Sequence, residues 1–310
     1  MDINLIKTFL EVAATGSFVA ASERLFVTQS AVSLRIQRLE DSLGRPLFSR
    51  SKSGAILTSA GREFEKYALS LTKIWAEAQQ QIGIPEGYSR SLTIAAQYSL
   101  WPRLGFRWID ELRKDMPELS LRAEIGMPDR LTRFMIEGVV QAALVYTPQM
   151  RPGLRAEKLI DEELVLVAPW KDPTLDLKGR YTFVDWGPEF VQAHAVNLPE
   201  LTNPGLTLSL GALGAEYILE RETAAYLPAR YVKRYLDAKK LYLVADAPVF
   251  PYPIWSMWRE DLDPSVARVA QAALSRITAK IDVAQSHVLK DLANLNETDG
   301  VQILGDLLDT

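Results

Sequence analysis

The first sixty residues carry the pattern that most restricts the fold, because short amphipathic segments follow one another with a capping residue before each. Asp2, Ser17 and Thr28 stand at the starts, where a side-chain oxygen can accept a hydrogen bond from the first helical turn. Gly44 follows the third segment, as glycine does after helix ends. Residues 25–28 form a tight turn between the second segment and the third. The spacing therefore predicts three helices in a helix-turn-helix arrangement.

In the third predicted helix, Val32, Ile36 and Leu39 fall on one apolar stripe, which indicates burial. At about 100° per residue, the other side carries hydroxyl, amide and guanidinium groups, which can hydrogen-bond base edges and phosphates. Leu34 on that side could meet a thymine methyl group. The residues predicted to contact DNA are Thr28, Gln29, Ser30, Ser33, Leu34, Gln37 and Arg38.

A basic, glycine-containing loop follows the third helix. Short extended pieces on either side of residues 51–54 predict a β-hairpin wing, with Arg50 and Lys52 placed to reach DNA phosphates or the minor groove. Residues 24–62 hold seven Lys and Arg against two Asp and Glu, although the whole chain has a net charge of −4. A local basic patch on an acidic protein favours a DNA-binding module. The alternative is a solvated surface on which basic residues cluster by chance.

This N-terminal segment closely resembles the winged helix-turn-helix of LysR-type transcriptional regulators. The residues that carry the resemblance are Phe9, Val12, Ala13, Gly16, Ser17, Phe18, Ala20, Ala21, Leu25, Thr28, Gln29, Ser30, Ala31, Val32, Ser33, Ile36, Leu39, Glu40, Leu43, Gly44, Leu47, Phe48, Arg50, Leu57, Thr58 and Gly61. The resemblance implies a winged helix-turn-helix domain over residues 1–58, which binds operator sites in double-stranded DNA. It also implies an effector-binding domain in the rest of the chain.

The segment from residue 59 to about residue 83 reads as one long helix with a repeating apolar seam. Its apolar residues step by alternating threes and fours, the spacing of a coiled coil. We predict dimer contacts at Phe64, Tyr67, Leu71, Ile74 and Ala78. The alternative is a helix that packs on its own domain. The resemblance implies a linker and dimerisation helix over 59–88, and a homodimer that often pairs into a homotetramer on bent DNA.

Beyond the turn-rich residues 85–89, strand-like and helix-like segments alternate, which predicts an α/β architecture with largely parallel sheets. The resemblance implies a fold like that of periplasmic binding proteins over residues 89–281. Two subdomains would be joined by crossovers near 160–163 and 259–264, with the ligand between them. Residues 282–310 form an acidic C-terminal extension with leucines at helical spacing, to which we assign no role beyond packing or an oligomer contact.

The ends of the predicted strands gather polar and aromatic side chains, which suits a binding cleft for a small organic effector with a flat or apolar part. The predicted effector-binding residues are Gln97, Tyr98, Ser99, Trp101, Met127, Asp129, Tyr146, Asp185 and Trp186. Each has a plainer alternative. Ser99 and Asp129 could merely cap helices, and Trp101, Tyr146 and Trp186 could merely fill the core.

Composition narrows the remaining function classes. The chain has no cysteine and two histidines, so thiol chemistry is absent and we expect neither a metal nor a cofactor. No membrane span or secretory signal is recognisable, which favours a cytoplasmic protein. No phosphate-binding glycine loop, G-x-S-x-G or H-E-x-x-H motif supports an enzyme. The favoured function is an effector-responsive transcriptional regulator that controls the access of RNA polymerase. The alternatives are a constitutive DNA-binding regulator and an enzyme fused to a DNA-binding head.

Overall fold

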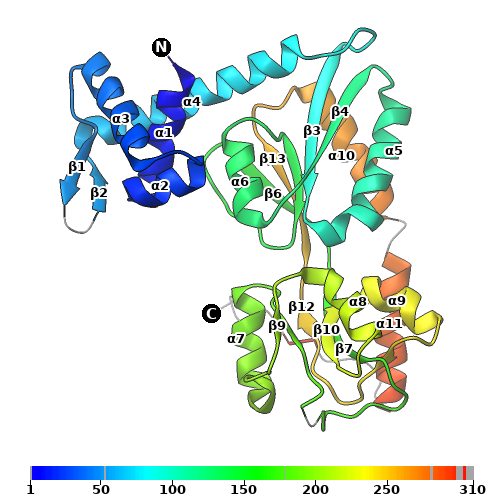
Figure 1. Ribbon diagram of the computed structural model, residues 1–310. Coiled ribbons are helices and arrows are strands. Elements are labelled where there is room, and N and C mark those ends of the chain that lie inside the picture. The colour runs from blue at the N-terminus through cyan, green and yellow to red at the C-terminus, as the bar shows by residue number, and fades with distance from the viewer. Residues whose placement is uncertain (1, 52–53, 178, 280–281, 298–302, 305–310) are drawn as a thin grey trace. The chain divides into compact units, whose positions relative to one another are not determined.

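The computed structural model describes residues 2–51, 54–177, 179–279, 282–297 and 303–304 (Figure 1). The chain divides into two compact units, which are Met1–Ser91 with Arg133–Val140, and Leu92–Thr132 with Gln141–Thr310. Within the described ranges, no helix combines the length and the apolar character that crossing a membrane requires.

The first unit opens with the predicted helices, α1 (Ile3–Thr15), α2 (Phe18–Leu25) and α3 (Gln29–Leu43). Each begins at a side-chain oxygen that accepts a backbone N–H of its first turn, at Asp2 (2.8 Å), Ser17 (3.3 Å) and Thr28 (3.2 Å). Gly44 ends α3 with φ 65°, a left-handed conformation that glycine adopts at little cost. The predicted caps and the helix-turn-helix arrangement are confirmed.

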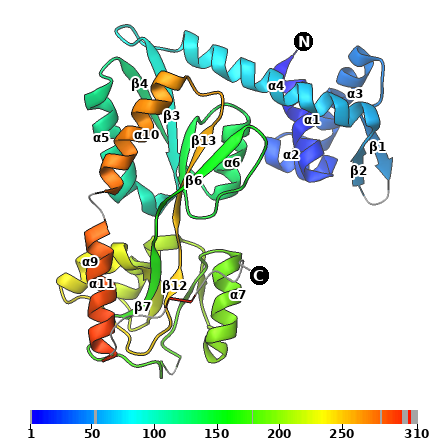
Figure 2. The same ribbon diagram turned by 180° about the vertical axis from the view of Figure 1, so that it is seen from behind.

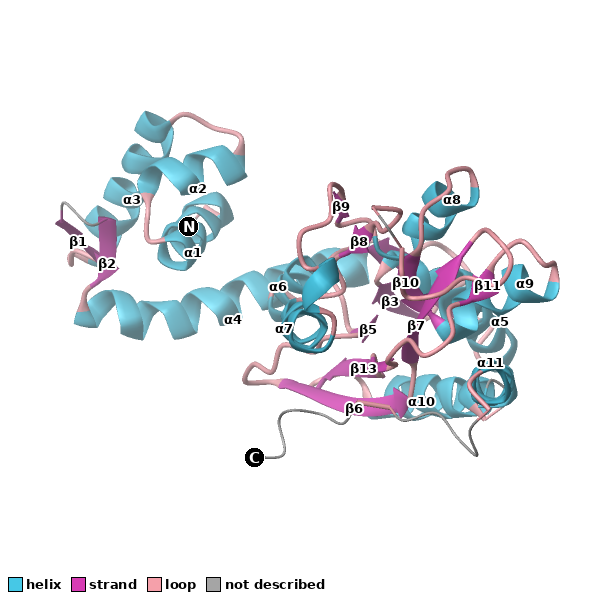
Figure 3. Ribbon diagram, turned by 90° about the horizontal axis from the view of Figure 1, so that it is seen from below, coloured by secondary structure: helices cyan, strands magenta, loops and turns pink. Residues whose placement is uncertain are grey.

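The predicted wing is also confirmed (Figure 3). Strands β1 (Phe48–Ser51) and β2 (Gly54–Leu57) pair antiparallel. The buried ring of Phe9 in α1 lies 5.3 Å from the ring of Phe48 in β1 and 5.0 Å from the ring of Phe64 in α4 (Ser59–Ile82). One aromatic contact network therefore holds the first helix, the wing and the long helix together.

The first subdomain of the second unit is built on a sheet with strand order β4-β3-β5-β13-β6. Its strands are β3 (Arg90–Ala96), β4 (Leu119–Ile125), β5 (Ala142–Val145), β6 (Leu154–Ile160) and β13 (Ile254–Arg259). Helices α5 (Phe106–Asp115) and α10 (Pro264–Thr278) lie side by side in both views (Figures 1 and 2). Trp108 fixes their contact, because its indole N–H donates to the carbonyl of Ala270 at 2.9 Å.

The second subdomain has a smaller sheet, in which β7 (Glu163–Ala168) pairs with its neighbours on both sides. The neighbours are β10 (Ala225–Pro228), β11 (Tyr242–Leu243) and β12 (Phe250–Pro251), and a separate pair joins β8 (Phe183–Val184) to β9 (Thr207–Leu208). Its helices include α7 (Pro188–Asn197), α8 (Gly214–Leu219) and α9 (Ala229–Asp237). Every residue of β7 is buried, and all of them except Glu163 are apolar.

The mixed α/β architecture is confirmed, but the expectation of largely parallel sheets is wrong. Strands β10, β11 and β12 all pair antiparallel with β7, and β13 pairs antiparallel with both β5 and β6. Strands β3 and β5 are parallel, as expected of a helix-containing crossover. The difference arises because the chain returns from the second subdomain through β13. This strand inserts between β5 and β6, which both precede it in the sequence.

The chain passes between the subdomains at Asp161–Glu162, within the predicted first crossover. It returns at Tyr252–Pro253, between β12 and β13, so the second crossover expected near 259–264 is misplaced. The two passages are joined directly, since the backbone N–H of Tyr252 donates to the carbonyl of Glu162 at 2.6 Å.

The C-terminal extension packs on the second subdomain. Helix α11 (Asp282–Leu295) contacts α9, and its Val288 and Leu292 are buried in the core. Farther on, the backbone N–H of Leu304 donates to the carbonyl of Val249 at 3.0 Å. The expected packing role is therefore confirmed for this part, whereas Leu307 and Leu308 lie outside the described residues.

Candidate functional site

Helix α3 presents one apolar and one polar side. Val32, Ile36 and Leu39 are buried in the core of the first unit. The predicted contact residues on the other side are exposed, apart from Ser33, which is half-buried. The exposed set is Gln29, Ser30, Leu34, Gln37 and Arg38. The hydroxyl, amide and guanidinium groups of α3 are therefore exposed to solvent, while its apolar side packs in the core of the unit.

Thr28 and the wing complete this surface. The hydroxyl of Thr28 caps α3 and lies 2.9 Å from the hydroxyl of Ser30, so it is already engaged within the protein. The backbone of Arg50 belongs to β1, whereas its side chain and all of Lys52 lie outside the described residues. The predicted roles of Arg50 and Lys52 consequently stay predictions.

The seam of α4 divides between the interior and the surface. Phe64 packs on Phe9 in its own unit, as the alternative interpretation of this helix required. Tyr67 and Ile74 are 62% and 59% exposed, which is unusual for large apolar side chains. A groove runs beside them between α4 and the start of α1, lined by Asp2, Ile3, Ile6, Leu71, Ile74, Trp75 and Ala78.

A cavity of about 500 Å³ lies between the two subdomains of the second unit. The predicted effector residues that line it are Gln97, Tyr98, Ser99, Met127, Asp129, Tyr146, Asp185 and Trp186. They follow the ends of β3, β4, β5 and β8, so strand ends from both subdomains meet at one place. Its volume lies in the range of small-molecule sites.

Hydrogen bonds hold several of these residues in place. The side-chain oxygen of Gln97 accepts the backbone N–H of Tyr146 at 2.7 Å, which ties the end of β3 to the end of β5. Ser99 donates to the hydroxyl of Tyr146 at 3.1 Å. The indole N–H of Trp186 donates to the carbonyl of Tyr226 at 2.9 Å, so Trp186 is fixed from the second subdomain.

Trp101 does not line this cavity, which corrects the sequence prediction. It is buried, its ring lies 5.7 Å from that of Phe106, and it packs so tightly on Gly105 that a methyl group there would overlap it. Residues 101–105 form a π-helical turn, which rotates Trp101 away from the direction that an α-helix from Ser99 would give it. Its role is that of a core residue.

Sequence reasoning missed other lining residues, including Gln149, Ser209 and Tyr252. Tyr252 is 8% exposed and stacks on Tyr146 with ring centroids 4.1 Å apart. The ring of Trp186 meets Tyr252 edge-on at 5.2 Å. These aromatic side chains form a continuous wall that includes residues from both subdomains and from the second passage between them.

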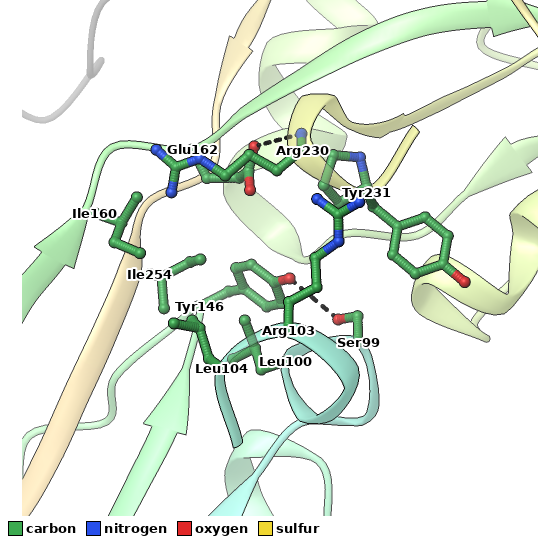
Figure 4. Close-up of a pocket in the computed structure, with 11 residues that line it drawn as sticks. Ser99, Leu100, Arg103, Leu104, Tyr146, Ile160, Glu162, Arg230, Tyr231 and Ile254 are labelled. Atoms are coloured by element: carbon green, nitrogen blue, oxygen red, sulfur yellow. Dashed lines mark hydrogen bonds between the residues drawn. The ribbon is translucent and has the colours of Figure 1, made fainter. Parts of the chain in front are cut away.

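A second cavity of about 30 Å³ lies behind Ser99 and Tyr146, and charged side chains are among those that line it (Figure 4). Glu162 and Arg230 are each 4% exposed, and the carboxylate of Glu162 accepts the backbone N–H of Arg230 at 3.2 Å. The guanidinium of Arg230 donates to the carbonyl of Asp161 at 2.9 Å. Burial raises the pKa of Glu162 to about 7, an effect that the positive charge of Arg230 opposes.

His194 has a structural setting and lines neither cavity. It is 1% exposed, its Nε2 lies 2.8 Å from the hydroxyl of Tyr181, and the rings of Phe183 and Phe190 surround it. Burial lowers its pKa from 6.5 to about 4, so the ring is neutral at neutral pH.

Two family profiles match the chain and together cover most of it. Residues 3–62 match the bacterial regulatory helix-turn-helix proteins of the lysR family, and residues 85–277 match the LysR substrate binding domain. The HTH-type transcriptional regulator HdfR of Yersinia enterocolitica is 30% identical over 274 residues, which span 85% of this chain and 92% of that protein. HdfR of Yersinia pestis matches to the same extent.

Solved structures agree in fold. Full-length LysG of Corynebacterium glutamicum with bound effector Arg gives a TM-score of 0.54 at 21% identity, covering 90% of this chain and 99% of that one. ArgP of Mycobacterium tuberculosis gives 0.53 at 22% identity, covering 91% and 98%. The matches to both family profiles and to HdfR show that the chain belongs to the LysR family and is a DNA-binding transcriptional regulator with an effector-binding domain.

Proposed function

We propose that the exposed side of α3 enters the major groove of double-stranded operator DNA, with the wing against the neighbouring backbone. The supporting observation is that Ser33 and Gln37 stand away from the buried stripe of α3, while Gln29 is exposed in its first turn. Amide and hydroxyl groups read base edges, while Arg38, Arg50 and Lys52 neutralise phosphates. Leu34, 49% exposed, contacts a thymine methyl group.

The DNA-binding species is a homodimer joined through α4, and dimers pair into a tetramer. The exposed Tyr67 and Ile74, together with the groove beside them, support this proposal, since a second α4 would cover them. A small organic effector occupies the cleft between the subdomains. Its binding shifts the arrangement of the DNA-bound protein by its difference in affinity for the two arrangements, and so changes the access of RNA polymerase.

Ser33 offers the sharpest test of the DNA-binding surface. Duplexes selected by the wild-type protein from a randomised pool serve as the DNA, so that the operator need not be known. Ser33→Ala and Gln29→Ala should each weaken binding by about tenfold or more in gel shifts, since lost base contacts cost about 1–3 kcal/mol.

Ser42→Ala is the matched control. Ser42 follows Ser33 by nine residues on the same helix, which places it about 900° on, on the opposite side. Its hydroxyl donates within the helix to the carbonyl of Leu39 at 2.8 Å. We expect Ser42→Ala to bind like the wild type. Equal binding by all the variants would refute the assignment of this surface. The effector role has a separate test, in which small organic compounds are screened for a change in DNA binding. If no compound changed DNA binding, the effector role would be refuted.

A further inference from the structure

The charged residues that line the larger cavity are both acidic. Asp129 and Asp185 line it, and none of its described lining residues is Lys, Arg or His. Glu189 adds a third carboxylate nearby, because its Oε2 lies 3.7 Å from where a Cβ on the lining residue Gly187 would stand. The cations Arg103 and Arg230 line the smaller cavity instead, behind the wall of Tyr146 and Ser99 (Figure 4).

The lining carboxylates retain unused capacity to accept hydrogen bonds. One oxygen of Asp185 accepts the backbone N–H of Gly187 at 2.9 Å, and one oxygen of Asp129 accepts the amide of Gln149. Within the described part of the chain, no hydrogen bond reaches the other oxygen of either residue. A carboxylate has about four acceptor positions, so each can bind a further donor.

Tyr252 gives an independent indication of a ligand. Its side chain is nine-tenths buried and lines the cavity, yet among the described residues no group hydrogen-bonds its hydroxyl. Burial raises the pKa of Tyr252 well above its ordinary value, and the charges of Tyr146, Asp185 and Glu189 add to this shift. A hydroxyl that has no protein partner on a residue lining a cavity can bind a ligand or water there.

We propose that the cleft binds an organic cation, a ligand with an ammonium or guanidinium group on a short carbon chain. Asp129 and Asp185 pair with the charged group, the Tyr252 hydroxyl accepts one of its N–H groups, and Met127, Tyr98 and Trp186 contact the carbon chain. Aromatic rings attract cations as well as apolar groups. An anion would meet the like charge of these carboxylates, and none of the described lining residues is a cation. This inference rests on the proposed effector role of the cleft.

The test uses the full-length protein and calorimetric titration with four sets of compounds. The sets are putrescine and agmatine, which carry no carboxylate, lysine and arginine, which carry one, leucine, which is neutral, and glutamate and benzoate, which are anions. We expect binding from a cationic set, weakened by added salt as charge pairing requires. Asp185→Asn and Asp129→Asn each remove one negative charge. Each should weaken cation binding by about tenfold or more, since a hydrogen bond to a charged group contributes about 1.5–3 kcal/mol.

Asp110→Asn is the matched control, because Asp110 is exposed on α5 and does not line the cavity. It should bind the cation like the wild type. The proposal is overturned if the anions or leucine bind in preference, if no cation binds at millimolar concentration, or if both cleft variants bind cations unchanged. An anion or neutral compound that binds and changes DNA binding in gel shifts would overturn the proposal of a cationic ligand. The effector role of the cleft would then still stand.

Discussion

The rings of Tyr146 and Tyr252 stack with their centroids 4.1 Å apart and their planes 20° from parallel. Tyr146 follows β5 in the first subdomain, whereas Tyr252 lies in the passage that returns from the second. The backbone of Tyr252 also bonds to Glu162 in the other passage. A single aromatic pair therefore connects the wall of the ligand cleft to the segments that join the subdomains.

Removal of the Tyr252 ring should destabilise the second unit. Tyr252→Ala is expected to cost about 3–5 kcal/mol of unfolding free energy, as for other buried aromatic side chains. Tyr252→Phe keeps the stacked ring and loses only a hydroxyl that has no hydrogen-bond partner among the described residues, so its cost should stay below about 1 kcal/mol. Urea unfolding of both variants checks this, and equal losses would show that the stacking is unimportant.

Glu162 should make stability depend on pH near neutrality. Its folded-state pKa of about 7 lies above the ordinary 4.5, so the folded protein binds this proton more tightly than the unfolded chain. The resulting stabilisation is complete below the ordinary pKa and is lost as pH rises through 7. Glu162→Gln keeps an oxygen for the Arg230 N–H and cannot ionise.

Between about pH 5 and about pH 8, the wild type should lose about 1–3 kcal/mol relative to Glu162→Gln in urea unfolding. The control is Glu260→Gln, which changes an exposed glutamate. Parallel pH profiles for the wild type and Glu162→Gln would contradict the prediction.

His194 acts in the opposite direction. Because burial lowers its folded-state pKa from 6.5 to about 4, the unfolded chain takes up a proton first as pH falls. Stability should therefore decline as pH falls from 6.5 towards 4. His194→Gln, which retains a polar partner for Tyr181, should show a shallower decline in thermal melts. The control is His287→Gln at an exposed position of α11, and it should follow the wild-type profile.

A charge in the groove of α4 should separate the protomers. Ile74→Glu is expected to halve the mass in sedimentation analysis and to weaken DNA binding, because an ionised side chain cannot be buried unpaired. The far-UV spectrum should remain that of the wild type, since Ile74 is 59% exposed within its own unit. Gln79→Glu adds the same charge at an exposed position of α4 and should leave the mass unchanged. An unaltered mass for Ile74→Glu would place the interface elsewhere.

Local signals in the sequence predicted the first unit well. Asp2, Ser17 and Thr28 satisfy N–H groups within three residues of themselves, so their capping roles can be deduced without knowledge of the remaining fold. Likewise, polar residues after strands predicted most of the cleft. The direction of strand pairing depends on contacts between distant segments, and for this reason the parallel arrangement was predicted wrongly.

The errors in the site have equally specific causes. Trp101 follows Ser99 by two residues, but a π-helical turn begins at Trp101. This turn changes the direction in which the Trp101 side chain points. Tyr252 follows a very short strand and stands between Pro251 and Pro253, so no strand-end pattern marks it.

Helix α11 matters for anyone who exchanges or shortens the effector-binding half. The segment that matches the LysR substrate binding domain ends at residue 277, whereas Val288 and Leu292 complete the core beyond it. A chimaera or biosensor truncated at residue 277 would expose the apolar surface of the second subdomain that α11 covers. Such a protein is expected to aggregate. Grafts should therefore carry the chain through residue 304, which retains the bond between Leu304 and Val249.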